Sequence, residues 1–220
     1  MNQKCEYKGS IGRSEVLAMR VRTCSAVVLA LTLGCVMAMA QAVVTQTLVI
    51  DTQKSKMTVH VYKAGLFSAL GHDHEIEAPI ESGEIDTKAR TVRLMVDARK
   101  LKVLDPELAA DKREEVQKEM HSDHVLDSPK FPEIRFQSTS VEMANGGMNV
   151  KGQLTVHGQT QPVSVEVKEE NGQYTGRSKF KLTSFGIKPP SAGGGAVKSK
   201  DEIMVEFAIV PVKRMEFGGR

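Results

Sequence analysis

Alternation of apolar and polar residues is the feature that most constrains how this chain can fold. The segments MTVHVYK (57–63), TVRLMV (91–96) and EIMVEFAIV (202–210) each place large apolar residues at every second position. Successive side chains of a strand point to opposite faces, so a period of two predicts β-strands with one dry and one wet face. The pattern is typical of an antiparallel sheet that is covered on one side only.

The same alternation recurs in PVSVEVKEE (162–170) and RSKFKLTSF (177–185), and turn signals separate the predicted strands. These signals are Glu81-Ser82-Gly83, Asn145-Gly146-Gly147, His157-Gly158 and Asn171-Gly172, and Asn-Gly is the strongest short-range indication of a hairpin. One segment departs from the pattern. It begins with Asp105-Pro106, a capping residue and a first-turn proline, and continues with helix formers. We therefore expect one helix at about 106–122, lying across the sheet.

An all-β chain of this kind either closes into an antiparallel barrel or stacks as two layers. Closure removes exposed strand edges, and a barrel of about eight strands has room for one small ligand. The alternation does not distinguish the two architectures. Taken alone, it favours inward residues that fill a solid core over residues that enclose a cavity.

The first forty residues have the pattern of a secretory signal peptide. Arg20 and Arg22 precede a short apolar run that ends in Ala38-Met39-Ala40, the arrangement that a Sec-type leader requires. We expect residues 1–40 to be the leader, Met19 to be the true start, and residues 41–220 to form one periplasmic or secreted domain. A transmembrane anchor, which needs roughly 20 apolar residues, and a lipid-modified Cys35 are the weaker alternatives.

Composition outside the leader excludes two classes of function. Residues 41–220 carry 25 basic and 25 acidic residues, so the domain lacks the basic footprint of a nucleic-acid-binding protein. All three cysteines, Cys5, Cys24 and Cys35, lie within the leader. The mature domain therefore has neither a disulfide nor a thiol nucleophile, and its stability must come from burial of its core.

The motif GHDH (71–74) is the most chemically suggestive stretch. His72 and His74 share parity with the apolar residues up to Ile80, so an unbroken strand would turn both imidazoles inward. Three interpretations stay open: hydrogen bonding within the protein, contact with the headgroup of a ligand at the cavity mouth, or metal binding. A metal site would need further ligands, and the available imidazoles would be His72, His74, His121 and His124; we otherwise expect no metal site.

No catalytic residue is predicted. The chain contains neither a Ser-centred elbow nor a His-Glu-x-x-His motif. The alternative function is a periplasmic metal-binding protein or a metal-dependent hydrolase centred on GHDH, in which His72, His74 and His121 would hold a metal-activated water.

The order of further motifs resembles the YceI-like family of exported lipid-binding proteins. It comprises HVLDSPKFPEIRFQSTSVE (124–142), VKGQLTVHGQTQPVSVEV (150–167) and SFGIKPPSAGGG (184–195), within a resemblance that covers residues 47–213. The resemblance implies a lipocalin-like antiparallel barrel that holds a polyisoprenoid or fatty chain in its lumen, without a cofactor. One departure is LVIDTQKSKM (48–57), where the family's first strand often carries an aromatic residue.

With this resemblance, the expected role of the inward residues changes from a solid core to the lining of a lumen. We expect His72 and His74 at its mouth, and the methionines Met57, Met143 and Met148 would make the lining they join adaptable. The segment PPSAGGGAVKSKD (189–201) is expected to be a connection near the mouth.

The expected partner is an isoprenoid or fatty-chain lipid, with no nucleic acid and no stable transmembrane anchor; a homodimer stays open. The expected lining residues are Val59, Val61, Leu94, Val96, Ile134, Phe136, Leu154, Val156, Val165, Phe180, Leu182, Val205 and Phe207.

Overall fold

The computed structural model describes residues 47–65, 72–144, 146–192 and 197–213. They belong to one compact unit, which spans Thr45–Arg220. The predicted leader lies outside the described residues, as do Asn145 and the glycines at 193–195. In the described ranges, no helix combines the length and the apolar character that crossing a membrane requires.

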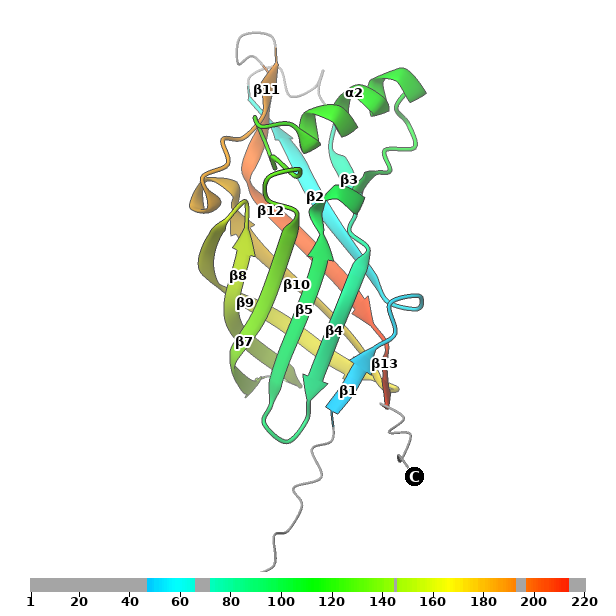
Figure 1. Ribbon diagram of the computed structural model, residues 1–220, viewed down its shortest axis with the longest axis vertical. Helices are drawn as coiled ribbons and strands as arrows, with labels where there is room; N and C mark the ends of the chain where they lie inside the picture. Colours follow the sequence, from blue (N-terminus) through cyan, green and yellow to red (C-terminus); the bar gives the residue numbers. More distant parts are fainter. Residues whose placement is uncertain (1–46, 66–71, 145, 193–196, 214–220) are drawn as a thin grey trace, which may run out of the picture. The chain divides into compact units, whose positions relative to one another are not determined.

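The described residues form one antiparallel sheet that curls round until its ends meet (Figure 1). The strand order around it is β1-β4-β5-β7-β8-β9-β10-β12-β2. Strand β12 pairs with β2, and β13, which continues β12, pairs with β1, which precedes β2. The strands are β1 (Thr47–Ile50), β2 (Lys56–Ala64), β3 (His74–Glu77), β4 (Ile80–Asp86), β5 (Thr91–Asp97), β6 (Lys102–Val103), β7 (Glu133–Ala144), β8 (Gly147–Val156), β9 (Gln159–Glu170), β10 (Gln173–Lys181), β11 (Ser191–Ala192), β12 (Val197–Ile209) and β13 (Pro211–Lys213).

The predicted all-β barrel class is confirmed, but the strand count differs, because the described sheet has thirteen strands rather than about eight. Four long runs are interrupted: β1–β2, β3–β4, β5–β6 and β12–β13. Two of these breaks have an evident local cause. Between β1 and β2, the Asp51 carboxylate accepts hydrogen bonds from two following backbone N–H groups and so holds a turn. Between β3 and β4 stands Pro79, which has no N–H to donate to a ladder.

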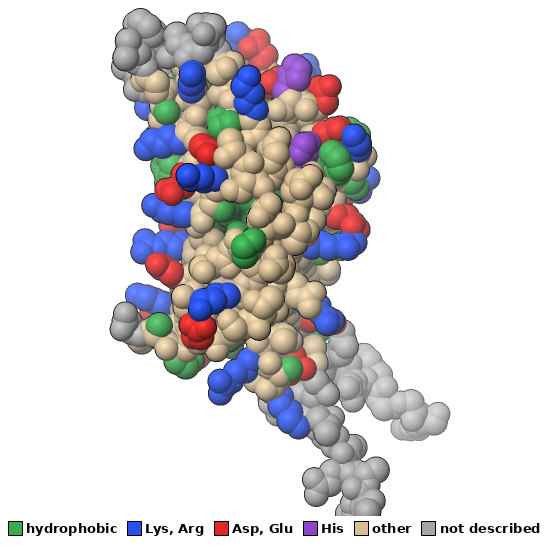
Figure 2. Space-filling model, turned by 90° about the vertical axis from the view of Figure 1, so that its left-hand side faces the viewer, with side chains coloured by type: hydrophobic (Ala, Val, Ile, Leu, Met, Phe, Trp, Pro, Cys, Tyr) green, Lys and Arg blue, Asp and Glu red, His purple; other side chains and the backbone are tan. Residues whose placement is uncertain are grey.

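The outer face of the sheet is polar, as the alternation predicts. Ion pairs join neighbouring strands, such as Arg177 Nε with Glu166 Oε2 at 2.9 Å and Lys179 Nζ with Glu202 Oε1 at 3.6 Å. Figure 2 shows one such face, with charged side chains spread over it and few apolar ones. The apolar residues of the sheet therefore face inward.

Helix α2 (Ala110–His121) covers one end of the barrel (Figure 1). Its Met120 is buried, and its Val116 packs against the buried cluster that includes Ile76. The helix begins at Ala110 and not at 106, which corrects the predicted start. The reason is that the Asp105 carboxylate does not cap the helix; it accepts hydrogen bonds from His74 and from the Glu75 backbone.

Other apolar groups close the same end of the barrel. The 3-10 turn η3 (Leu182–Phe185) follows β10, and Phe185 is only 1% exposed. The cluster around it includes Val125, Leu182 and Ile187. A second 3-10 turn, η2 (Ala98–Lys100), links β5 to β6 and buries Ala98. These groups narrow this end of the barrel, and Leu182, Phe185 and Ile187 also line the interior space.

Two of the predicted turns join strands through two residues with positive φ. His157 and Gly158 have φ of 51° and 71°, and Asn171 and Gly172 have 54° and 77°, as in the type I′ turns that suit hairpins. The prediction of a turn at Glu81-Ser82-Gly83 is wrong, because these residues lie inside β4. Gly83 stands there because a Cβ atom would lie 2.3 Å from Ile50 Cδ1.

Candidate functional site: the apolar lumen

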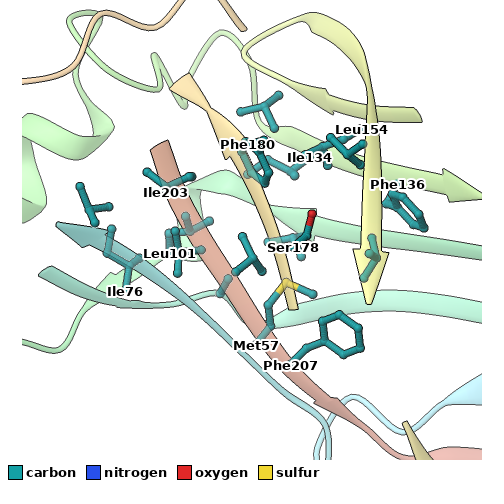
Figure 3. Close-up of a pocket in the computed structure, with 18 of the residues that line it drawn as sticks. Met57, Ile76, Leu101, Ile134, Phe136, Leu154, Ser178, Phe180, Ile203 and Phe207 are labelled. Carbon is teal, nitrogen blue, oxygen red and sulfur yellow. The ribbon is translucent and has the colours of Figure 1, made fainter. Parts of the chain in front are cut away.

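The barrel encloses a cavity of about 1040 Å³. Ligand pockets usually measure about 300–1,000 Å³, so this cavity stands at the upper end of that range. Its walls are the inward faces of β2, β5, β7, β8, β9, β10 and β12, and Figure 3 shows their apolar side chains around one shared space. All thirteen lining positions expected from the sequence lie along it, as do Met57, Met143 and Met148.

The exposure of the inward residues distinguishes a hollow barrel from a solid one. Val59, Val61, Phe180 and Phe207 point into the barrel, yet each is only half-buried. In a close-packed interior such side chains would have almost no accessible surface. They keep accessible surface here because they border empty space. The solid core that the alternation alone favours is therefore not what forms.

The middle of the lumen offers a bound molecule almost no hydrogen-bonding group. The Ser178 hydroxyl faces the cavity (Figure 3), but it donates to the Ser164 carbonyl at 2.8 Å. Tyr174 also lines the wall. Burial, together with the nearby Glu169 carboxylate, raises the pKa of the Tyr174 phenol, which therefore stays uncharged at neutral pH. Such a lining binds through dispersion and exclusion of water.

His74 is held in place at one end of the cavity by a buried carboxylate. Its Nδ1 lies 2.6 Å from Asp105 Oδ2, and Asp105 Oδ1 accepts the Glu75 N–H at 2.8 Å. Asp105 is only 3% exposed. Because a carboxylate only accepts hydrogen bonds, the proton of this contact is on Nδ1, and Nε2 is left for another partner. The exposed His72 also lines the cavity, on the same side as His74.

The other two predicted imidazoles do not join them in a metal site. His121 Nε2 lies 2.6 Å from Gln117 Nε2 and His121 Nδ1 lies 3.0 Å from Ser128 Oγ, so this ring ties α2 to the segment that follows it. His124 lines the cavity rim and is exposed there. Its Nδ1 lies 3.3 Å from Glu119 Oε1. In the part of the chain that the structure describes, no group of three or more His, Cys, Asp or Glu residues could hold a metal ion.

Sequence reasoning missed several polar residues of the rim. Lys63, Lys198 and Ser199 line the cavity from the ends of β2 and β12 near His74, and Glu119 of α2 lines it as well. One signal was available for Lys63, which has the parity of Val59 and Val61 and so had to face inward. The pairing of His74 with Asp105 had no such signal, because the two residues are separated by 31 positions.

Comparison with known proteins finds relatives by sequence and a solved structure with the same fold. A UPF0312 protein of Vibrio cholerae serotype O1 is 26% identical over 172 residues, which cover 72% of this chain and 87% of the relative. Protein YceI of Escherichia coli O17:K52:H18 is 31% identical over 81 residues, covering 32% of this chain and 42% of that protein. The crystal structure of BcnA from Burkholderia cenocepacia superposes with a TM-score of 0.51 at 19% identity, covering 73% of this chain and 98% of BcnA, and shows the same fold.

The family match covers most of the chain. The YceI-like domain is matched over residues 48–210, from the first strand of the barrel to the end of β12. The match includes every strand that lines the cavity. This chain belongs to the YceI-like family.

Proposed function

We propose that this protein is a non-catalytic binding protein that holds one isoprenoid or fatty-chain lipid in its lumen. The observation that carries the proposal is the hollow of about 1040 Å³ bordered by half-buried apolar side chains. Burial is worth roughly 25 cal/mol per Å² of apolar surface, so a hydrocarbon chain can bind tightly there without directional contacts. Family membership supports the same role.

The polar end of the ligand would sit at the rim that carries His72 and His74. The Asp105 carboxylate fixes the His74 ring through Nδ1, and Nε2 is the ring nitrogen left for the ligand. A hydroxyl group could donate to this nitrogen when the imidazole is neutral, and an anionic oxygen could accept from it when the imidazole is protonated. The arrangement orients the ligand, with the head at the rim and the chain in the lumen.

Export to the periplasm or the medium is part of the proposal. It rests on the leader-like composition of residues 1–40. N-terminal sequencing of the purified product checks it: a chain that begins at Gln41 is expected, and one that retains residues before Gln41 would contradict export with cleavage.

Mass spectrometry of protein purified under native conditions tests the ligand class. We expect a hydrophobic molecule to co-purify and to be released by organic solvent. A stoichiometric transition metal without lipid would instead favour the metal-binding alternative centred on residues 71–74.

A charge in the lumen gives a sharper test. Val205 lines the cavity from β12, and its neighbour Met204 faces the opposite side of the same strand. Val205→Asp is expected to abolish lipid retention and to destabilise the fold, because a carboxylate would lose its water. Met204→Asp is the matched control and should retain lipid.

A second variant separates lost binding from lost folding. Val205→Trp adds apolar volume to an empty space, so the protein should fold as the wild type does while the lumen loses capacity. Lipid content is measured per folded protein, by extraction after gel filtration. Unchanged lipid content in both Val205 variants would show that the lumen is not the binding site.

A further inference from the structure

The sheet has a discontinuity at the end of the barrel opposite α2. The ladder between β5 and β7 runs from the pair Asp97–Glu133 to the pair Arg93–Gln137. Strand β7 continues to Ala144, whereas β5 begins at Thr91. In the described residues, β7 beyond this point is paired with β8 only. In Figure 1, the β4–β5 and β7–β8 hairpins both lie at this lower end.

A side chain replaces the backbone ladder where the two strands separate. The Val92 N–H donates to Ser138 Oγ at 2.7 Å, and Ser138 is 5% exposed. This bond pairs the N–H of Val92, the last one that β5 directs toward β7, although the backbone ladder between the two strands has already ended at Arg93. The two strands can therefore diverge without leaving a buried donor unpaired.

A β-bulge next to Ser138 changes which residues of β7 face inward. Ser138 pairs with Gly152 and Ser140 pairs with Lys151, so Thr139 is the extra residue. Before the bulge, Ile134 and Phe136 line the cavity; after it, the odd-numbered Val141 and Met143 do. A bulge inserts one residue and bends its strand, and here it keeps apolar side chains on the cavity side of the free half of β7.

Met143 has two properties that together indicate an opening. It lines the cavity, and it is 76% exposed. A side chain that borders an internal space and also contacts solvent stands at an opening. The exposed Arg90 and the half-buried Thr91 line the cavity from the β4–β5 side.

We propose that the lumen has a second opening between β5 and the free half of β7, through which the tail of a long-chain ligand leaves the barrel. We call it the side portal; it is formed by Arg90, Thr91, Val92, Val141 and Met143. The inference rests on the proposed lipid-binding function and deepens it. Because the portal is open, the lumen sets no upper limit on chain length.

The geometry also defines the class of ligand that reaches the portal. Cavity-lining residues on β7 extend from Ile134 to Met143, a run of about 30 Å at roughly 3.4 Å per residue. A ligand with its head at the His74 rim must cross the lumen before its tail meets Met143. Short fatty chains remain inside, and only long ones contact the portal. The flexible thioether of Met143 suits contact with a tail of variable position.

Thiol accessibility at the portal tests the inference, since the only native cysteines lie in residues 1–40. In a full chain with those three cysteines replaced by serine, Met143→Cys is treated with a water-soluble maleimide, alone or with saturating lauric or lignoceric acid. Lignoceric acid should slow alkylation of the thiol about tenfold, because contact of the thiol with about two methylenes of the tail stabilises the covered state by roughly that factor. Lauric acid should leave the rate unchanged.

The control is Val212→Cys, at the other exposed large apolar residue of the described chain, which does not line the cavity. Neither acid should slow its alkylation. Binding of both acids is measured in parallel by native mass spectrometry. If lignoceric acid binds but Met143→Cys reacts at an unchanged rate, or if both acids protect it equally, the portal is disproved and the lipid-binding function stands. If neither acid binds, the fatty-chain form of the proposed function fails, and the portal with it.

Discussion

Asp105 is the residue on which the geometry of the rim depends. Its buried carboxylate accepts from His74 Nδ1 and from the Glu75 N–H, and thereby joins β3 to the segment that leads into α2. From the sequence alone, Asp-Pro predicts a helix cap, because local chemistry is all that a sequence displays. The Asp105 carboxylate instead accepts a hydrogen bond from the distant His74, and the helix starts four residues later than predicted.

We expect Asp105→Asn to lower the free energy of unfolding by about 2–3 kcal/mol, because an amide cannot replace both bonds to a buried carboxylate. Urea unfolding followed by circular dichroism measures the change. The control is Asp111→Asn, at an exposed position on α2, which should change stability by less than about 0.5 kcal/mol. A similar loss in both variants would mean that the buried contacts contribute nothing specific.

At the scale of elements, alternation predicted the faces of the strands well. The residues expected inward on β2, β5, β9 and β12 all line the cavity. The failures occur where a strand is interrupted or shifted. The sequence predicts a turn at Gly83 because the side chain that packs against this residue, that of Ile50, is not evident from the sequence. The bulge at Thr139 was missed because the polar run QSTS (137–140) shows no alternation that could be seen to shift.

The contact of β4 with β1 gives a testable prediction about packing. Gly83→Ala would place a Cβ 2.3 Å from Ile50 Cδ1 and 3.1 Å from the Arg93 carbonyl oxygen. We expect a loss of about 1–3 kcal/mol in the free energy of unfolding, the usual cost of overpacking a core. In an Ile50→Ala background the same substitution should cost about 1 kcal/mol less, since neighbouring residues couple. Equal costs in both backgrounds would show that Ile50 is not what excludes a side chain at 83.

At the scale of the whole molecule, the important property is that the barrel is hollow. Alternation assigns residues to the inside but carries no information about the width of the interior, because a filled barrel and an empty one have the same period. The half-buried state of Val59 and Phe207 distinguishes them, and only the closed sheet reveals it. The resemblance to the YceI-like family, and not the residue pattern, was what predicted a lumen.

A hollow protein should be stabilised by whatever fills it. A ligand that binds only the folded state adds about 2.7 kcal/mol at a hundred times its Kd, which for a domain of this size raises the unfolding midpoint by about 5–10 °C. Delipidated protein titrated with lignoceric acid in a calorimeter should show this rise, and Val205→Trp should show a smaller one. Binding without any rise in the midpoint would place the lipid outside the folded barrel.

The bulge in β7 has a consequence for what the lumen presents beside the side portal. The inward residues change from even to odd numbers at Thr139, because the bulge absorbs one residue. If β7 ran through this point as a regular strand of the same sequence, Glu142 would face the wall in place of Met143. The local backbone geometry, and not the choice of any amino acid, thus presents a thioether where a carboxylate would otherwise oppose the passage of hydrocarbon.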